Sequence, residues 1–577
     1  MLLLVVVVGA GLVLRTAFLS RAAVEHFDEG VYASSVWFDE TYAHQYPRLH
    51  LYGPPLIPWL AKAALVCEYM LREGSGAAPA SWTPILPPLA AACLMPLAVW
   101  WIARGWFGIA PAMGAAVLCA FSDLHAAYSR AVLTDALMAL LFLLSVWLIQ
   151  KAIAGWSWRT AVAAGCMTAA AWWTKYNGWL PLAIGLGATL LAAVAQRPPW
   201  RESLGRVARW CAVAAIAVLA WSPVLILLQP FGGYAQVAAN HRNYLVGLSR
   251  WLDTAGHQHA NLCFFDGAVT IGSFLAASAV IAFPRIRGLE RKHRRRACVG
   301  VAALAISLAA IAALLGSAVV LLVLALAGIS DRVRSIIARA GRGDDWPAAD
   351  WFLAVWFLGL FALTPMYVAY PRLVLPWLTS AWLGAGLGLH RLIDLAVGME
   401  VRSVAPKRMW AYSIVICIAG GTLLNCGSQI VTRRVPAWSD RTGMKQVAAG
   451  IRADLEAYAR REGISPDEVL VCVYGEPALF YQLRAAGMQH VLPVVEIPGA
   501  EDRREAAIKA LVLVSGPHAR RTPEFQLDWT RQQTRFDRLN RYAFWPSELL
   551  LLDQHDPRID LRNGRRIRDE VVLDVMK

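Results

Sequence analysis

The chain has 577 residues, and 58% of them are hydrophobic while only 16% are charged. Soluble domains carry about a quarter charged residues, so this composition excludes a single soluble core for most of the chain. The formal net charge of +15 comes from Lys and Arg residues grouped in loops between apolar segments, with no nucleic-acid-binding pattern among them. We therefore expect a polytopic α-helical membrane protein without a nucleic acid partner.

About thirteen apolar segments have a length that suits a transmembrane helix. They lie near residues 2–20, 84–104, 108–127, 131–150, 160–174, 177–195, 207–228, 264–283, 298–315, 317–330, 350–369, 373–395 and 410–430. The first begins MLLLVVVVGAGLVL and has no basic region ahead of it, so we interpret it as an uncleaved helix rather than a signal peptide. The stretch 298–330 is either one long tilted helix or a hairpin that turns at Gly316 and Ser317.

Loops dense in Arg and Lys predict the orientation, because such loops stay on the cytoplasmic side. They are residues 196–209, 284–296, 331–342 and 401–408. Since 298–330 lies between two of them, a hairpin is favoured there. The loops 21–83 and 229–263 then face outward. We predict a multi-pass protein of the plasma (inner) membrane of a bacterium, with a transmembrane domain over 1–430 and an extracytoplasmic domain over 431–577.

The C-terminal segment changes character. The strand-like run VLVCVY covers 469–474, and a segment that starts with Pro and ends at Gly over 477–487 has the signature of a helix. Two more strand-like runs, 490–495 and 511–515, flank a polar helical stretch near 501–510. Alternating strands and helices predict a small α/β domain with a parallel sheet.

Two adjacent acids, Asp28 and Glu29, follow the first apolar segment in HFDEGVYASS, and Asp135 lies near the outer end of the fourth. Carboxylates this close to a membrane are costly and need a reason. The pair is a solvated loop, a metal site or a catalytic base. Asp135 is either a helix cap or an acid that faces a polar cavity.

Cations on the same expected side are Arg130, Lys175 and Arg372. Each alone is explained by a long side chain that reaches for the lipid headgroups. Together with the acids they predict an anion site, such as a phosphate site, beside a general base. The fitting chemistry is group transfer from a membrane phospholipid. No Cys or His spacing indicates a zinc site or a disulfide framework, so no metal or other cofactor is predicted, although a divalent metal is possible.

Five motifs in this order resemble the GT-C superfamily of polyprenyl-phosphate-sugar glycosyltransferases, nearest to protein O-mannosyltransferases and lipid A aminoarabinose transferases. They are FDEGVYA, YGPPLIPWL, SRAVLTDALMALL, TKYNGWLPL and, more weakly, YPRLVLP. The resemblance implies a GT-C fold over 1–430 and an inverting transfer from a polyprenyl-phosphate-linked sugar. It implies that Asp28 is the base, while Glu29 orients or tunes it and Asp135 orients a substrate.

The same motifs supply the expected binding residues. The donor phosphate is expected at Arg130, Lys175, Tyr370 and Arg372, and the substrate at Tyr32, Tyr52, Pro54, Pro55 and Tyr176.

The chain departs from the resemblance in two places. Aminoarabinose transferases tend to carry Glu-Lys before the Pro pair, where this chain has Tyr52 and Gly53. That argues against an equivalent metal site and assigns phosphate binding elsewhere, to Arg48, Lys175 or Arg372. Residues 431–577 have an α/β pattern, whereas protein O-mannosyltransferases usually carry β-trefoil repeats, which argues against an enzyme of the eukaryotic type.

Two other functional classes remain open. A transporter or flippase for a lipid-linked sugar would carry charged or broken segments near the midplane and a repeated architecture; the sequence shows no clear repeat. A non-catalytic scaffold would tolerate Asn at Asp28 and Asp135. The identities of the sugar and of the lipid, glycan or protein acceptor are open.

Overall fold

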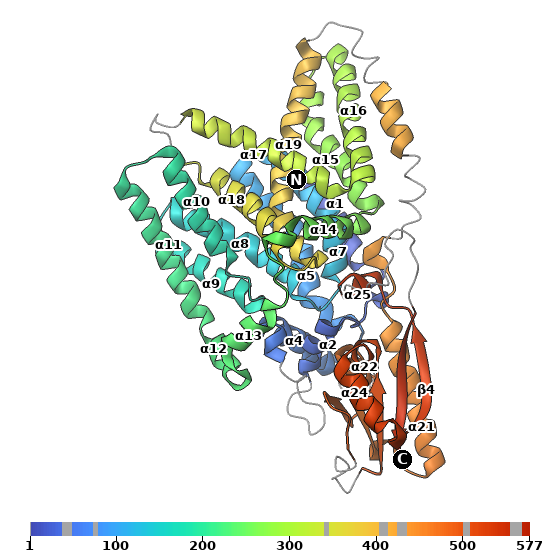
Figure 1. Ribbon diagram of the computed structural model, residues 1–577. Coiled ribbons are helices and arrows are strands. Elements are labelled where there is room, and N and C mark those ends of the chain that lie inside the picture. The colour runs from blue at the N-terminus through green and yellow to red at the C-terminus, as the bar shows by residue number, and fades with distance from the viewer. Residues whose placement is uncertain are drawn as a thin grey trace. The chain divides into compact units, whose positions relative to one another are not determined.

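A computed structural model describes residues 2–36, 49–72, 79–339, 346–402, 414–423, 435–499, 508–553 and 568–577 (Figure 1). The chain divides into two compact units. The helical unit comprises Met1–Ala17, Ala90–Ser129 and Asp135–Ala437, and the mixed unit comprises Phe18–Leu89, Arg130–Thr134 and Trp438–Lys577.

Helices of different lengths build the helical unit. They are α1 (Leu2–Thr16), α5 (Leu86–Phe107), α6 (Ile109–Ala120), α7 (Asp123–Ser129), α8 (Thr134–Ala154), α9 (Trp158–Thr174), α10 (Leu180–Gln196), α11 (Trp200–Trp221), α12 (Pro223–Leu228), α13 (Gly233–Arg242), α14 (Trp251–Phe265), α15 (Ala268–Arg287), α16 (Arg291–Leu315), α17 (Ser317–Arg339), α18 (Ala348–Leu363) and α19 (Leu375–Arg402). Among the described residues, seven helices are long and apolar enough to cross a membrane, or eight if α6 and α7, bent by 56°, form one span.

Every predicted span coincides with a helix, although the last is described only over 414–423. In the part of the chain that the structure describes, the helices of membrane-crossing length are fewer than the thirteen predicted spans, partly because α9 and α10 have only 17 residues each and because the α6–α7 pair is bent. The stretch 298–330 is broken at Gly316, where φ is 90°. The carboxylate of Asp266 accepts from the backbone N–H of Ser317 at 2.6 Å and so caps the start of α17. The alternative of one continuous helix is therefore wrong.

A buried arginine stabilises the break between α6 and α7. Arg15 of α1 is fully buried and donates to the carbonyl oxygens of Ala120 at 2.8 Å and Cys119 at 3.1 Å. Its guanidinium also lies 2.8 Å from Nδ1 of His125. Carbonyls released by a helix break at membrane depth need such a partner. Arg15 therefore has a structural role here.

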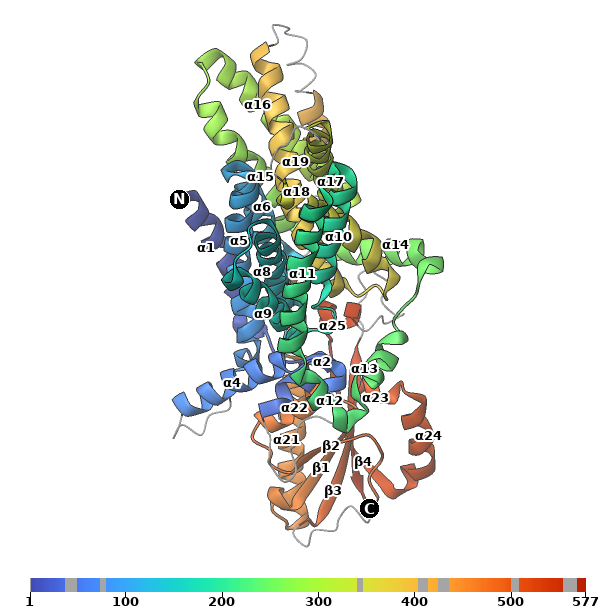
Figure 2. The same ribbon diagram turned by 90° about the vertical axis from the view of Figure 1, so that its left-hand side faces the viewer.

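Small residues bring α17 and α19 close together. A Cβ at Gly388 would lie 1.9 Å from the carbonyl oxygen of Leu324, and one at Gly328 would lie 2.6 Å from the backbone nitrogen of Gly388. Small residues at such crossings let helix backbones approach in the absence of a hydrophobic driving force. The two helices run against each other in both views (Figures 1 and 2).

The mixed unit combines a sheet with helices from both ends of the chain. Its elements are α2 (Phe27–Ala33), α3 (Leu49–Tyr52), α4 (Leu56–Leu71), α21 (Gly443–Glu462), β1 (Val469–Tyr474), α22 (Pro477–Ala485), β2 (Val491–Val494), β3 (Ala510–Ser515), α23 (Pro517–Arg520), α24 (Pro523–Gln532), β4 (Phe536–Phe544), α25 (Glu548–Asp553) and β5 (Asp569–Met576).

The five strands have the order β2-β1-β3-β5-β4 (Figure 2). Strand β1 is parallel to β2 and β3, while β5 is antiparallel to β3 and β4. The predicted parallel sheet is thus confirmed for the first three strands, and the two antiparallel strands were missed. Most of the helix predicted near 501–510 lies outside the described residues.

Candidate functional site

Helix α2 carries the acidic pair, and local chemistry fixes where it starts. The Nδ1 atom of His26 accepts from the backbone N–H of Asp28 at 3.1 Å, and the Glu29 carboxylate accepts from the backbone N–H of His26 at 2.9 Å. This reciprocal pair is a capping box, with His in the position usually held by Ser or Thr. Acids in a first turn also interact favourably with the helix dipole.

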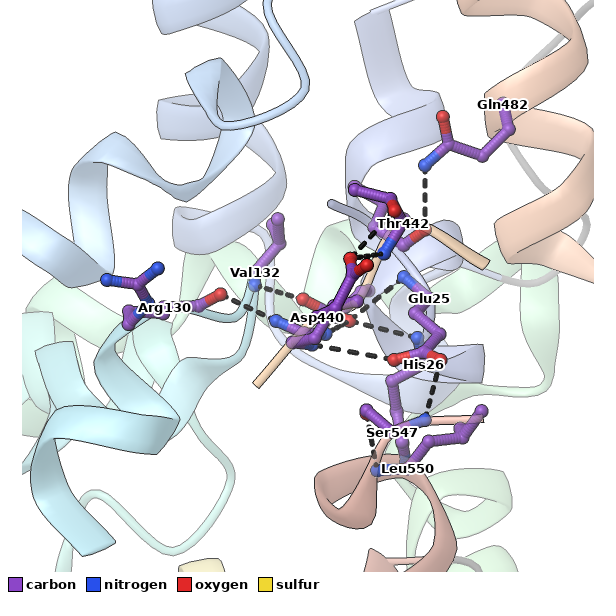
Figure 3. Close-up of polar contacts among 12 residues, drawn as sticks. Glu25, His26, Arg130, Val132, Asp440, Thr442, Gln482, Ser547 and Leu550 are labelled. Atoms are coloured by element: carbon purple, nitrogen blue, oxygen red, sulfur yellow. Dashed lines mark hydrogen bonds and ion pairs between the residues drawn. The ribbon is translucent and has the colours of Figure 1, made fainter. Parts of the chain in front are cut away.

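Glu29 is fully buried and ties three chain segments together. Its Oε1 accepts from the backbone N–H of Val132 at 2.7 Å, and its Oε2 accepts from the guanidinium of Arg441. Figure 3 shows the backbone of Val132 reaching this cluster. A carboxylate with these partners is held in place and shielded from solvent. The side chain therefore anchors α2.

Glu25 completes the same network. Its Oε1 accepts from the backbone N–H of Ser547 at 2.8 Å, and its Oε2 lies 3.6 Å from Nε of Arg441 (Figure 3). Burial raises the pKa of Glu25 to about 7, because the desolvation cost of the charged form exceeds the attraction of Arg441. Two buried acids thus share one guanidinium, which also donates to the carbonyl oxygen of Arg130.

Arg130 lies in the mixed unit and is 1% exposed. Its Nη2 donates to the carbonyl oxygen of Phe18 at 2.8 Å. Burial lowers its pKa to about 10, and the nearby Arg441 and Arg21 act in the same direction.

Asp28 is half-buried, and the residue before it packs on aromatic groups of the mixed unit. The ring of the preceding residue, Phe27, lies 5.4 Å from that of Tyr52 and 4.6 Å from that of His518. The Tyr32 hydroxyl donates to the carbonyl oxygen of Tyr52 at 3.3 Å. Tyr32 and Tyr52 are thus in contact near the start of α2, and the roles predicted for Asp28, Tyr32 and Tyr52 stay predictions.

The adjacent prolines have a structural position. Pro54 and Pro55 are buried, and Pro55 is the N-cap of α4. A Cβ at Gly53 would lie 2.7 Å from the Tyr32 hydroxyl oxygen, so the glycine leaves room for this tyrosine. The predicted phosphate residue Arg48 lies outside the described residues.

A second group of predicted residues lies in the helical unit. The Nζ atom of Lys175 is 2.5 Å from Oδ1 of Asp135, and Asp135 is 3% exposed. The ring of Tyr176 contacts those of Tyr234 at 6.1 Å and His241 at 5.7 Å, both on α13. The second long loop therefore packs directly beside the predicted cation.

The same loop reaches the late hairpin. Backbone hydrogen bonds join Val246 to Met366 and Val368 to Tyr244, both at 2.9 Å. The Tyr244 ring lies 6.1 Å from that of Tyr370, and the guanidinium of Arg372 lies 5.4 Å from the Tyr370 ring centre.

The sequence analysis predicted Tyr176, Tyr370 and Arg372 separately. It did not predict that the loop 229–263 contacts both Tyr176 and Tyr370. Figure 2 shows α13 and α14, the helices that precede and follow the hairpin-contacting segment of this loop.

Among the described residues, no group of three His, Cys, Asp or Glu side chains is placed to hold a metal ion. The prediction that no metal takes part stays a prediction. Sequence reasoning missed Arg441 and His518, which lie hundreds of residues from the groups they contact.

Residues 53–227 match the family described as dolichyl-phosphate-mannose-protein mannosyltransferase. The structure is similar to that of ArnT from Cupriavidus metallidurans bound to undecaprenyl phosphate, with 15% identity, a TM-score of 0.52, and coverage of 99% of this chain and 97% of that one. A second similar structure is the Archaeoglobus fulgidus oligosaccharyltransferase in complex with Zn and sulfate, with 15% identity, a TM-score of 0.46, and coverage of 89% and 68%. No curated protein matches the chain. The family match bears out the expected resemblance over 53–227, and the chain shares the fold of the similar ArnT structure.

Proposed function

We propose that the protein is a membrane glycosyltransferase that moves a sugar from a polyprenyl-phosphate-linked donor to an acceptor hydroxyl on the extracytoplasmic face. The fold and the family match over 53–227 support this class of reaction. The similar ArnT structure contains undecaprenyl phosphate, which supports a polyprenyl phosphate as the carrier.

The observation that carries the proposal is the difference between two neighbouring acids. Glu29 is buried and paired with Val132 and Arg441, whereas Asp28 is half-buried. A general base must reach the proton that it abstracts. Asp28 meets that need, and Glu29 holds the helix on which Asp28 stands.

The proposed step inverts the anomeric centre. The acceptor oxygen attacks the anomeric carbon while its proton passes to the Asp28 carboxylate. The bond between the anomeric carbon and the phosphate oxygen breaks, and its electron pair leaves with the polyprenyl phosphate. Cations near the phosphate stabilise the charge that develops on it.

The cations that the sequence predicts for this role are Lys175 and Arg372. Asp135 pairs with Lys175 at 2.5 Å and fixes the direction of the ammonium group. The Tyr370 ring supports the guanidinium of Arg372. Aromatic rings on α13 contact Tyr176, the residue after Lys175, and provide stacking surfaces for a sugar or an isoprenoid chain.

The test uses purified protein in phospholipid nanodiscs. Radiolabelled polyprenyl-phosphate sugars are offered one at a time, with a lipid and glycan extract from a deletion strain as acceptor. We expect label to enter one acceptor as polyprenyl phosphate is released, and Asp28→Asn to reduce this by at least about 10²-fold, the usual scale for a general base. Asp440→Asn, at an exposed residue of the same unit, is the matched control.

Two outcomes would contradict the proposal. If the Asp28→Asn variant transferred the sugar at the parental rate, Asp28 would not be the base. Movement of an intact labelled donor across sealed vesicles, without label in any acceptor, would instead identify a transporter for a lipid-linked sugar.

A further inference from the structure

The turn between α15 and α16 carries a dense group of cations. Helix α15 ends at Arg287 and α16 begins at Arg291, and the two helices run side by side in both views (Figures 1 and 2). The side chain of Arg294 donates to the carbonyl oxygens of Arg287 at 3.1 Å and Leu289 at 3.0 Å. These bonds tie the start of α16 to the end of α15 and so fix the shape of the turn.

Four exposed cations of this turn form what we call the hairpin cluster: Arg287, Arg291, Lys292 and Arg295. In the part of the chain that the structure describes, none of the four forms an ion pair with a carboxylate. Glu290 is the only acid between residues 285 and 300, and its side chain does not cap α16. The cluster therefore presents an excess of positive charge on the surface of the helical unit.

Neighbouring cations of the same unit have acidic partners. Arg285 of α15 forms an ion pair with Asp394 of α19, and Arg332 of α17 pairs with Asp350 of α18 at 2.7 Å. Each of these pairs joins two helices and so has a structural role. The hairpin cluster joins no helices by ion pairs among the described residues, so its charges need another explanation.

The arrangement of the cluster is unfavourable for the protein alone. Arg291 and Arg295 lie four residues apart on α16, and Lys292 and Arg295 lie three apart. Like charges at these spacings destabilise a helix, and cations in a first turn interact unfavourably with the helix dipole. A bound anion would reverse both effects. Real proteins break such local rules mainly at functional sites.

Apolar side chains next to the cluster indicate the kind of anion. Phe283 is 62% exposed and lies one turn before Arg287 on α15, and the exposed Cys298 follows Arg295 on α16. From Arg291 to Leu315, α16 is long and apolar enough to cross a membrane. An anionic group at the cluster would thus stand at the head of an apolar surface. Groups of four or more Lys and Arg beside a transmembrane helix suit anionic lipid headgroups.

We propose that the hairpin cluster binds an anionic phospholipid, whose phosphodiester headgroup contacts the four cations while its acyl chains lie along α15 and α16 beside Phe283. The lipid is held without any covalent step. This site goes beyond the proposed function, because it involves neither Asp28 nor the donor, and its test does not depend on sugar transfer.

The test measures lipid binding to the full-length protein in micelles of a neutral detergent. Fluorescent phosphatidylglycerol and phosphatidylcholine with the same acyl chains are titrated, and fluorescence anisotropy gives the two dissociation constants. We expect phosphatidylglycerol to bind at least about 10-fold more tightly, since each cation near an anionic headgroup contributes about 5-fold. This preference should shrink when NaCl is raised from about 50 mM to about 500 mM, because salt screens exposed charges.

Two sets of substitutions locate the site. The first converts the whole hairpin cluster to Gln and should abolish the preference for phosphatidylglycerol, and Arg291→Gln with Arg295→Gln alone should reduce it. The matched control removes the same number of exposed cations from the mixed unit: Lys445→Gln, Arg460→Gln, Arg461→Gln and Arg531→Gln. It should keep the parental preference. Melting temperatures show whether each variant is folded, and the double variant decides the question if the fourfold variant is not.

Four results would overturn the proposal. Equal affinity of the parent for both lipids would leave the cluster as an orientation signal only. An unchanged preference after loss of the cluster would place the lipid elsewhere, and an equal loss in the control would make net charge the cause. Competition by glycerol phosphate as strong as that by the intact lipid would identify a site for soluble phosphate.

Discussion

Replacing Gly30 with Ala should strongly reduce sugar transfer while the mixed unit stays folded. The new Cβ would lie 2.1 Å from the backbone nitrogen of Ala478 and 2.2 Å from the carbonyl carbon of Pro477. Both are backbone atoms, so no rotamer change relieves the clash. Ordinary contact begins at 3.4 Å, and α2 must therefore move away from α22 by about 1.3 Å, the difference between the two distances.

The cost of this shift divides into two parts. Overpacking of a tight contact destabilises a fold by about 1–3 kcal/mol, which lowers the melting temperature but leaves the protein folded. A displacement of about 1 Å at a catalytic group can reduce the rate about 10²-fold. We expect a large loss of kcat, measured by sugar transfer at saturating donor, with a modest loss of thermal stability measured by tryptophan fluorescence.

Gly105→Ala is the matched control, because a Cβ at Gly105 meets no heavy atom within 4 Å. In a helix interior this change should raise stability by about 0.5–1 kcal/mol and leave the transfer rate alone. Parental kcat and melting temperature in Gly30→Ala would refute the reasoning, since they would mean that α2 is not seated on α22 as the structure has it.

Three further predictions concern buried groups. The folded-state pKa of Glu25 is raised to about 7, so the folded protein binds more protons than the unfolded chain between about pH 4.5 and 7. Stability should therefore fall by up to about 3 kcal/mol as pH rises through this window, and melting curves of Glu25→Gln should show a smaller fall. Gly388→Ala places a Cβ 1.9 Å from the carbonyl oxygen of Leu324, so size-exclusion chromatography should show loss of monodisperse protein. Lys175→Met leaves Asp135 buried without its cation, which should cost about 3–5 kcal/mol; adding Asp135→Asn should restore the melting temperature but not transfer.

The sequence predicts what depends on neighbours along the chain. The strand over 469–474 was predicted with its observed bounds, because a short apolar run between turn signals is sufficient for a buried strand. Strand β4, FDRLNRYAF, was missed since charged residues occupy its exposed positions. Its identity as a strand depends on pairing with β5, which no local pattern reveals.

In the candidate site, too, the sequence predicts only what depends on neighbours along the chain. Asp28, Asp135 and Lys175 were found because charges are rare beside apolar segments. Arg441 was missed although it pairs with Glu29, because 412 residues separate the two. From the sequence alone, an arginine just after the last apolar segment cannot be distinguished from a solvent-exposed arginine. Only the folded chain shows that it is 4% exposed and shared by two acids.

The buried partner also explains why two acids stand side by side. Successive residues of a helix point about 100° apart, so Asp28 and Glu29 cannot share one environment. Glu29 reaches Arg441 and the backbone of Val132, so the half-buried Asp28 points in another direction. A single Asp would be free to rotate with its helix. The second acid fixes that rotation, and the charge of Arg441 makes its burial tolerable. On this reasoning Glu29→Gln should harm transfer by releasing α2, and a base at position 28 depends on an anchor at position 29.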